Sequence, residues 1–123
     1  MFLNKNFKSD YRKGKHMLEN SKIYNFLNEV EYQDGSVVSK VIEKKSSGNV
    51  TLFAFDKGEF LSPHSAPYDA LVHIIDGSAE VIIDEQPYIL NQNEFIIMPA
   101  DIKHSVKATE RFKMILTMLK SKE

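Results

Sequence analysis

Residues 70–83 read Ala-Leu-Val-His-Ile-Ile-Asp-Gly-Ser-Ala-Glu-Val-Ile-Ile, with the triplet Asp76-Gly77-Ser78 between two apolar runs. Both runs are rich in β-branched residues, which is typical of strands. An Asp-Gly pair between two such runs predicts a tight β-hairpin, because both residues tolerate a positive φ. This stretch therefore predicts a chain built of short antiparallel strands.

The rest of the chain continues the same pattern. Strands are expected at Val37–Lys45, Val50–Phe55, Ala70–Ile75, Ala79–Ile83, Tyr88–Leu90, Glu94–Met98 and Phe112–Met118, with turns at 46–49, 84–87 and 91–93. No segment between them is long and periodic enough for the helix of a parallel crossover. Six or more short, evenly spaced strands predict an all-β closed barrel or two-sheet sandwich, with residues 50–55 and 112–118 in its core.

The first 34 residues lack this pattern and predict an N-terminal extension ahead of a barrel domain at residues 35–120. Basic side chains dominate positions 1–16 without any periodicity. We expect this arm to be solvated and partly disordered, or to precede a natural start at Met17. The alternative is a basic arm that binds a membrane surface or nucleic acid.

One short helix is expected within the extension. Ile23, Phe26 and Leu27 stand at i, i+3 and i+4, the spacing of one helix face. Asn20 or Ser21 precedes this pattern and would cap the first turn.

The amino-acid composition excludes several kinds of functional site and gives no support to several kinds of partner. The 123 residues include no cysteine, which excludes disulfides, a thiolate nucleophile and cysteine-based zinc sites. Sixteen basic and seventeen acidic residues give a net charge of -1, which gives no support to a nucleic-acid partner. No run approaches the roughly 20 apolar residues of a membrane span, and no apolar run follows the basic N-terminus as in a signal peptide. We expect a cytoplasmic protein without a nucleic-acid or membrane partner.

Two spaced motifs resemble those of cupins. Gly58-x5-His64, followed by Gly77 thirteen residues later, is similar to the first cupin motif. Asn93-x5-Pro99-x4-His104 is similar to the second, with Asn93 where a glycine is usual. The resemblance spans residues 35–119. It implies a cupin-like double-stranded β-helix, a jelly-roll barrel, with its pocket built around the two histidines.

The same resemblance implies a degenerate metal site. A metal-binding cupin reads His-x-His-x3-Glu in the first motif and adds a histidine in the second; here the matching residues are His64, Ala66, Ala70 and His104. Methyl groups cannot coordinate a metal, so two of four ligands are missing. We expect His64 and His104 to hold at most a weakly bound divalent ion, such as zinc, iron, manganese or nickel. The open alternative is a pair of hydrogen-bonded histidines without a metal.

Two other residues are candidates for additional ligands. Asp69 would complete a triad with His64 and His104, but strand alternation opposes this, although Pro67 interrupts the strand. His73 lies three residues after Ala70, so the alternation predicts it on the outer face, as a surface or interface histidine.

The walls of the pocket are expected to be mainly apolar. Tyr68 and Met98 are predicted to line or rim the ligand site. Its floor would come from the strand residues that share one face near the C-terminus: Phe112, Met114 and Leu116.

Two functions remain open from the sequence. The first is a non-enzymatic module that binds a small molecule, a weakly held divalent metal, or both. The second is a metal-dependent enzyme, such as a small dioxygenase, isomerase or decarboxylase. A purely structural barrel that acts through dimer contacts is a third. We also expect a homodimer, because Ile115, Leu119 and part of Val37–Ile42 present apolar side chains on an outer face.

Overall fold

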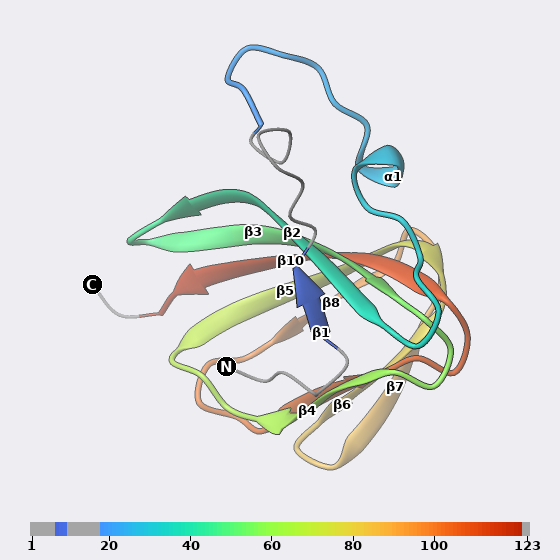
Figure 1. Cartoon of the computed structure of the whole chain (residues 1–123). Coiled ribbons are helices and arrows are strands. Elements are labelled where there is room, and N and C mark those ends of the chain that lie inside the picture. Colours follow the sequence, from blue (N-terminus) through green and yellow to red (C-terminus); the bar gives the residue numbers. More distant parts are fainter. Residues whose placement is uncertain (1–6, 10–17, 122–123) are drawn as a thin grey trace.

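The computed structural model describes residues 7–9 and 18–121, which form two β-sheets that enclose the core (Figure 1). The larger sheet has the strand order β1-β2-β3-β10-β5-β8 and the smaller sheet β4-β9-β6-β7. The strands are β1 (Phe7–Ser9), β2 (Val37–Lys45), β3 (Gly48–Phe55), β4 (Phe60–His64), β5 (Tyr68–Gly77), β6 (Ala79–Ile83), β7 (Gln86–Leu90), β8 (Phe95–Met98), β9 (His104–Lys107) and β10 (Phe112–Lys120). β1 pairs in parallel with β2, and the other strand pairs are antiparallel. The expected all-β jelly-roll fold is confirmed.

The two predicted core segments lie side by side in the larger sheet. β3 and β10 pair antiparallel, with Phe55 opposite Phe112. Residues 52–55 are all buried, and so are residues 112–118 apart from Thr117. The rings of Phe55 and Phe112 stack with their centroids 4.4 Å apart, which anchors the two strands against each other.

The predicted hairpin at 76–78 is wrong. β5 pairs with β8 and β10, whereas β6 pairs with β7 and β9, so the chain passes from one sheet to the other at Gly77. Both edges of β5 already have a neighbour, which leaves no edge for β6. Gly77 is required because its φ is +72° and a Cβ there would collide with the Arg111 carbonyl next to β10.

The tight hairpin lies one turn later, between β6 and β7. Ile83 pairs with Gln86, so Asp84 and Glu85 form a two-residue loop. Both loop residues have a positive φ, 48° and 69°, as a type I′ turn requires. Asn93 has a φ of +71°, which explains why asparagine can replace the usual glycine there.

The short helix exists but begins later than expected. α1 spans Phe26–Glu29, and the side chain of Asn25 caps it by accepting a hydrogen bond from the Leu27 amide. Ser21 has a positive φ of 61°, and Ile23 is 96% exposed. The spacing of apolar residues that predicted a longer helix therefore does not correspond to a buried face.

The segment around α1 covers part of the outer face of the larger sheet. Val30 is fully buried against a cluster that includes Val38, Leu52 and Ile115. Lys113 of β10 donates a hydrogen bond to the Leu27 carbonyl at 2.7 Å. Ile115 and Val38 are therefore not the exposed dimer contacts that the sequence predicted, because the chain covers these side chains itself.

The N-terminal arm is described only in part. Residues 7–9 form β1, which pairs with β2 from Val37 to Ser39 and which sequence reasoning missed. The rest of the basic arm, including His16 and Met17, lies outside the described residues. The division of the chain at residue 35 stays a prediction. In the part of the chain that the structure describes, no helix is long and apolar enough to span a membrane.

Candidate functional site

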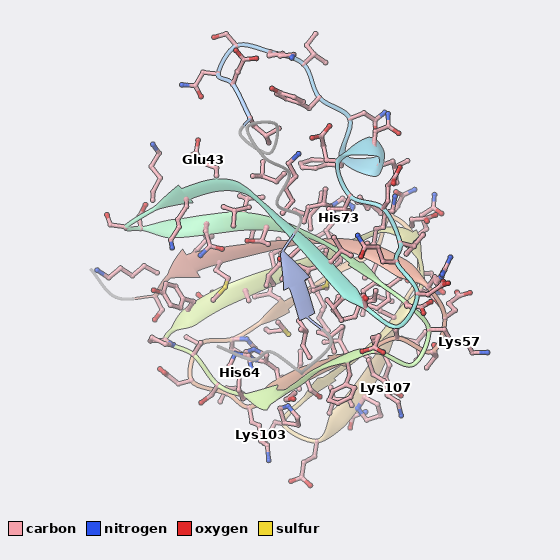
Figure 2. The ribbon with its side chains drawn as sticks, viewed as in Figure 1. Glu43, Lys57, His64, His73, Lys103 and Lys107 are labelled. Atoms are coloured by element: carbon pink, nitrogen blue, oxygen red, sulfur yellow. The ribbon has the colours of Figure 1, made fainter. Side chains whose placement is uncertain are left out.

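The structure brings His64 and His104 together. His64 ends β4, His104 begins β9, and the two residues face each other as Cα partners in the smaller sheet. Their ring centroids are 4.5 Å apart and the ring planes are inclined by 78°, an edge-to-face contact. His64 lies between the two sheets in Figure 2. The two motifs that are distant in the sequence therefore meet at one end of the barrel.

Hydrogen bonds between the two connections hold this end of the barrel together. The amide of Asp101 donates to the Ala66 carbonyl at 2.8 Å, and the amide of Ala100 donates to Oδ1 of Asp69 at 2.9 Å. Asp101 has a φ of +65°, which turns the chain back toward β9. These bonds link the residues after His64 to the residues before His104.

The tautomer of His104 follows from its hydrogen bond. His104 is 4% exposed, and its Nδ1 lies 3.1 Å from the Ile102 carbonyl oxygen. A carbonyl oxygen can only accept, so Nδ1 carries the proton and Nε2 carries the lone pair. His104 can therefore present Nε2 as a hydrogen-bond acceptor or as a ligand atom.

Both imidazoles are neutral near pH 7. Burial and, after it, the neighbouring His104 together lower the pKa of His64 to about 4, against a hydrogen bond to the Ser62 backbone that raises it. Burial also lowers the pKa of His104, against its hydrogen bond to Ile102. Burial is the largest cause of both shifts, so the apolar surroundings hold this pair of bases in its uncharged form.

The residues considered as extra metal ligands lie elsewhere. Asp69 is exposed, and its Oδ1 accepts the Ala100 amide rather than facing the imidazoles. His73 pairs with Phe95 and Ile115 in the larger sheet and lies on the side of that sheet away from His64 (Figure 2). The described residues contain no group of three or more histidine, aspartate, glutamate or cysteine side chains that could hold a metal ion. Two imidazoles alone do not make a tight divalent site.

The predicted lining residues belong to the core next to the pair. Met98 is 1% exposed and is the Cα partner of Ala70. Tyr68 is half-buried and packs against the same core, and it also borders an outer cavity of about 160 Å³ beside Asp101. The predicted floor residues are all buried in the core: Phe112, Met114 and Leu116.

Two further residues belong to the same core. Ile83 is the neighbour of His104 across β6 and β9, and it packs against the core. Met118 is buried and pairs with Ala70. Alternation along the last strand places Met118 on the same face as Met114, so extending the predicted floor by two residues would have found it.

A small cavity reaches His104 from outside. Its volume is about 150 Å³ and its lining includes Lys103, Ser105 and Ile82 as well as His104. Ser105 and Ile82 alternate with buried residues along β9 and β6, so this cavity opens on the outer face of the smaller sheet.

Comparison with known proteins places the chain in a family. Residues 51–119 match the Cupin domain family. A conserved protein of unknown function from Streptococcus pyogenes is 33% identical, with a TM-score of 0.81 over 86% of this chain and 93% of that one. A cupin 2 conserved barrel domain protein from Leptotrichia buccalis is 43% identical, with a TM-score of 0.77 over 79% of this chain and 47% of that one.

A third structure agrees with these two. A cupin superfamily protein from Desulfitobacterium hafniense is 25% identical, with a TM-score of 0.76 over 85% of this chain and 95% of that one. No curated protein matches the chain. The family match covers more than half of the residues and includes both histidines of the site. The chain belongs to the cupin superfamily.

Proposed function

We propose that this protein is a non-enzymatic binding module that holds a small molecule at the end of its barrel through His64 and His104. The observation that carries the proposal is the pair itself: two imidazoles in edge contact, kept neutral by burial, beside an apolar core. A neutral imidazole has one donor and one acceptor nitrogen; His104 already uses its donor on the Ile102 carbonyl, and His64 has a hydrogen bond to the Ser62 backbone. The remaining acceptor nitrogen suits a ligand with an apolar body and a group that donates a hydrogen bond, such as a hydroxyl or an amide N–H.

Alanine at two positions supports binding over catalysis. Ala66 and Ala70 occupy the places where a metal-dependent cupin is expected to carry its second histidine and its glutamate. Ala70 is 3% exposed on the inner face, so its methyl group contributes apolar wall. A dioxygenase, isomerase or decarboxylase that uses a divalent ion would lack the ligands to retain that ion.

A weakly held divalent ion is the second candidate occupant. The hydrogen bond from Nδ1 of His104 to the Ile102 carbonyl is the arrangement that commonly orients a metal-binding histidine. An ion of zinc, iron, manganese or nickel would be coordinated by two imidazole nitrogens and by water molecules. Such an ion would dissociate readily, because two protein ligands give little of the affinity of four.

Binding can be tested by nuclear magnetic resonance with a defined set of small aromatic alcohols, amides and carboxylic acids, and separately with zinc. We expect some of these probes to shift the imidazole resonances of His64 and His104. His64→Ala and His104→Ala should each lose that binding, while His73→Ala, on the outer face, should keep it. Equal loss in His73→Ala, or no shift of either imidazole with any probe, would contradict the proposal.

The pH dependence of probe binding provides a second test of the proposal. The ligand requires neutral imidazoles, and the pKa of His64 is lowered to about 4. We therefore expect a bound probe to remain bound well below pH 6, where an ordinary histidine protonates, and to dissociate as the pH approaches 4. Dissociation with a midpoint near pH 6.5 would show that the pair is not buried as described.

A further inference from the structure

A groove of about 420 Å³ lies between β7 and β8. β7 is one edge of the smaller sheet and β8 is one edge of the larger sheet, so the two walls of the groove belong to different sheets. His64 and His104 lie on β4 and β9, toward the opposite edge of the smaller sheet. The groove is therefore separate from the pair of imidazoles.

A tight turn connects the two walls and positions a carboxylate beside the groove. The Glu94 amide donates to the Asn91 carbonyl at 3.0 Å, and the Asn91 amide donates to Oε1 of Glu94 at 2.8 Å. Asn93, in the same turn, has a φ of +71°, and its amide donates to the Ile74 carbonyl of β5 at 2.7 Å. These bonds hold the Glu94 side chain through Oε1, and the second oxygen of its carboxylate can face a cation.

The groove has an apolar base and an aromatic rim. Leu90 is buried in the barrel core, and the half-buried Ile96 packs against the same core. Tyr88 and Phe95 line the groove from opposite walls and are 41% and 63% exposed. Because the face of an aromatic ring carries partial negative charge, it attracts a cation. Two rings and a carboxylate therefore make the rim attractive to positive charge.

Two other tyrosines of the protein already have cations of the chain beside their rings. Nζ of Lys22 lies 5.4 Å from the centre of the Tyr24 ring, and the cations of Arg111 and Lys113 lie 5.3 and 5.1 Å from that of Tyr32. Among the described residues that line the groove, by contrast, there is no lysine, arginine or histidine. A cation bound between the groove's rings would therefore be supplied by a ligand.

The chemistry of the groove favours an organic cation over a metal ion. Glu94 is the one charged side chain among the described residues that line it, whereas calcium prefers six to eight oxygen ligands. An alkylated ammonium needs no such ligand set, since aromatic faces stabilise it directly. The volume of the groove lies within the range of about 300–1,000 Å³ that is usual for small-molecule pockets, so it can also hold an apolar body.

We infer that the groove between β7 and β8 binds a small organic cation, a tertiary or quaternary ammonium group with an alkyl or aryl body. The ammonium group lies against the rings of Tyr88 and Phe95 beside Glu94, and the apolar body packs on Leu90 and Ile96. No covalent bond is made or broken. The inference is independent of the proposed function, because it uses neither histidine of the pair.

The test is a titration of the full chain followed by nuclear magnetic resonance at low ionic strength, where the carboxylate is least screened. The probes are benzyltrimethylammonium, choline and dimethylbutanol, the analogue of choline with carbon in place of the ammonium nitrogen. The variants are Tyr88→Leu, Phe95→Leu and Glu94→Gln. Leucine keeps an apolar side chain without a ring, and glutamine keeps an oxygen that can accept the Asn91 amide. Tyr24→Leu is the matched control, because Tyr24 is also exposed but lies outside the groove.

We expect both ammonium probes to shift the resonances of the residues that line the groove, and choline to bind at least about fivefold more tightly than dimethylbutanol. Tyr88→Leu and Phe95→Leu should each weaken choline binding about threefold. Glu94→Gln should weaken choline binding about twofold and leave dimethylbutanol binding unchanged. Tyr24→Leu should bind choline as the unaltered protein does.

Three results would overturn the inference: no shift with either ammonium probe, equal affinity for choline and dimethylbutanol, or equal weakening of choline binding in Tyr24→Leu. Light scattering tests a different occupant. A dimer mass that Phe95→Leu reduces, together with no effect of choline, would assign the groove to a second copy of the chain and would also overturn the inference. All the substituted side chains are exposed, so circular dichroism should show folded variants. If one variant does not fold, the other variants and the comparison of choline with dimethylbutanol decide.

Discussion

The molecule contains two groups of titratable side chains, one kept neutral by burial and the other charged and paired. Inside the barrel, His64 and His104 face each other, and burial keeps both uncharged. On the outer face of the larger sheet, acids meet bases in ion pairs and hydrogen bonds. We call this second group the outer clamp; its members are Glu29, Tyr32, Asp34, Lys40, Asp56, Asp76, Arg111 and Lys113.

The outer clamp explains why the N-terminal extension stays on the barrel. The Tyr32 hydroxyl donates to Oδ2 of Asp76 at 2.6 Å, and the cations of Arg111 and Lys113 lie 5.3 and 5.1 Å from the centre of its ring. Burial and the bond to Asp76 raise the pKa of Tyr32. Paired charges of this kind stabilise a fold, whereas bases that burial keeps neutral are the type of feature found at binding sites. This difference supports the binding role proposed for the histidines and a stabilising role for the clamp.

The largest expected effect comes from breaking the most buried pair of the clamp. Lys40 and Glu29 are 2.9 Å apart, with side chains only 9% and 16% exposed. Glu29→Ala leaves a buried ammonium without its partner, so we expect a loss of about 3 kcal/mol in the free energy of unfolding. This loss can be measured by unfolding both proteins in urea and monitoring the transition by circular dichroism.

The matched control is an exposed pair on the same segment. Lys22 and Glu19 are 3.5 Å apart and 58% and 72% exposed. Glu19→Ala should change the free energy of unfolding by less than about 0.5 kcal/mol. A Glu29→Ala variant as stable as Glu19→Ala would show that the clamp does not hold the segment to the sheet.

The second largest expected effect is a decrease in the free energy of unfolding in mild acid, caused by protonation of His64 in the unfolded chain. The pKa of His64 is lowered in the folded state, so between about pH 6.5 and pH 4 the unfolded chain binds a proton that the folded chain does not. The contribution of neutral His64 to the free energy of unfolding is therefore fully present above pH 6.5. It decreases as the pH falls toward 4, by about 2 kcal/mol between pH 7 and pH 4.5. Urea midpoints measured across this range should show the decrease.

His64→Gln is the control for that decrease, because glutamine keeps a polar side chain that does not titrate. The free energy of unfolding of this variant should change little with pH over the same range, apart from the contribution of His104. A curve as steep as that of the unaltered protein would assign the decrease to other groups.

The third effect belongs to the clamp and occurs at lower pH. The hydrogen bond from Arg111 lowers the pKa of the Asp56 carboxyl to about 2 from 3.8. An acid whose pKa is lowered by folding stabilises the fold above its ordinary pKa, and that contribution disappears as the pH falls through about 2. Asp56→Asn should lower the free energy of unfolding by a constant amount above about pH 4 and abolish the decrease between about pH 4 and pH 2, while the decrease above pH 4 keeps its slope. If it also removes the decrease above pH 4, the two regions are not independent.

The smallest effect on the stability of the single chain is expected from its remaining exposed apolar residues. Val41 and Leu119 are 54% and 57% exposed on the larger sheet, outside the area that the clamp covers. The homodimer stays a prediction that depends on such residues. Light scattering at micromolar concentration should give twice the chain mass, and Leu119→Asp should reduce it toward one chain without changing the urea midpoint extrapolated to low concentration. The monomer mass in the unaltered protein would reject the dimer.

Local sequence determined seven of the strands and the two motifs, but not β4 and β9, the short strands that carry His64 and His104. Alternating apolar residues gave β3 and β10 their inner faces, and the spacing around His64 and His104 was enough to identify the pair. These features depend on neighbours along the chain and on backbone preferences, so they can be read from one sequence.

Only the tertiary structure decided which strands pair and what surrounds each side chain. The Asp-Gly turn predicted a hairpin, but β5 already had β8 and β10 as neighbours, so Gly77 became a corner between sheets. The outer face of β10 looked available for a dimer, yet Val30, from a distant part of the sequence, covers it at Ile115. Pairing and burial depend on contacts between residues distant in the chain, and no local pattern encodes those contacts.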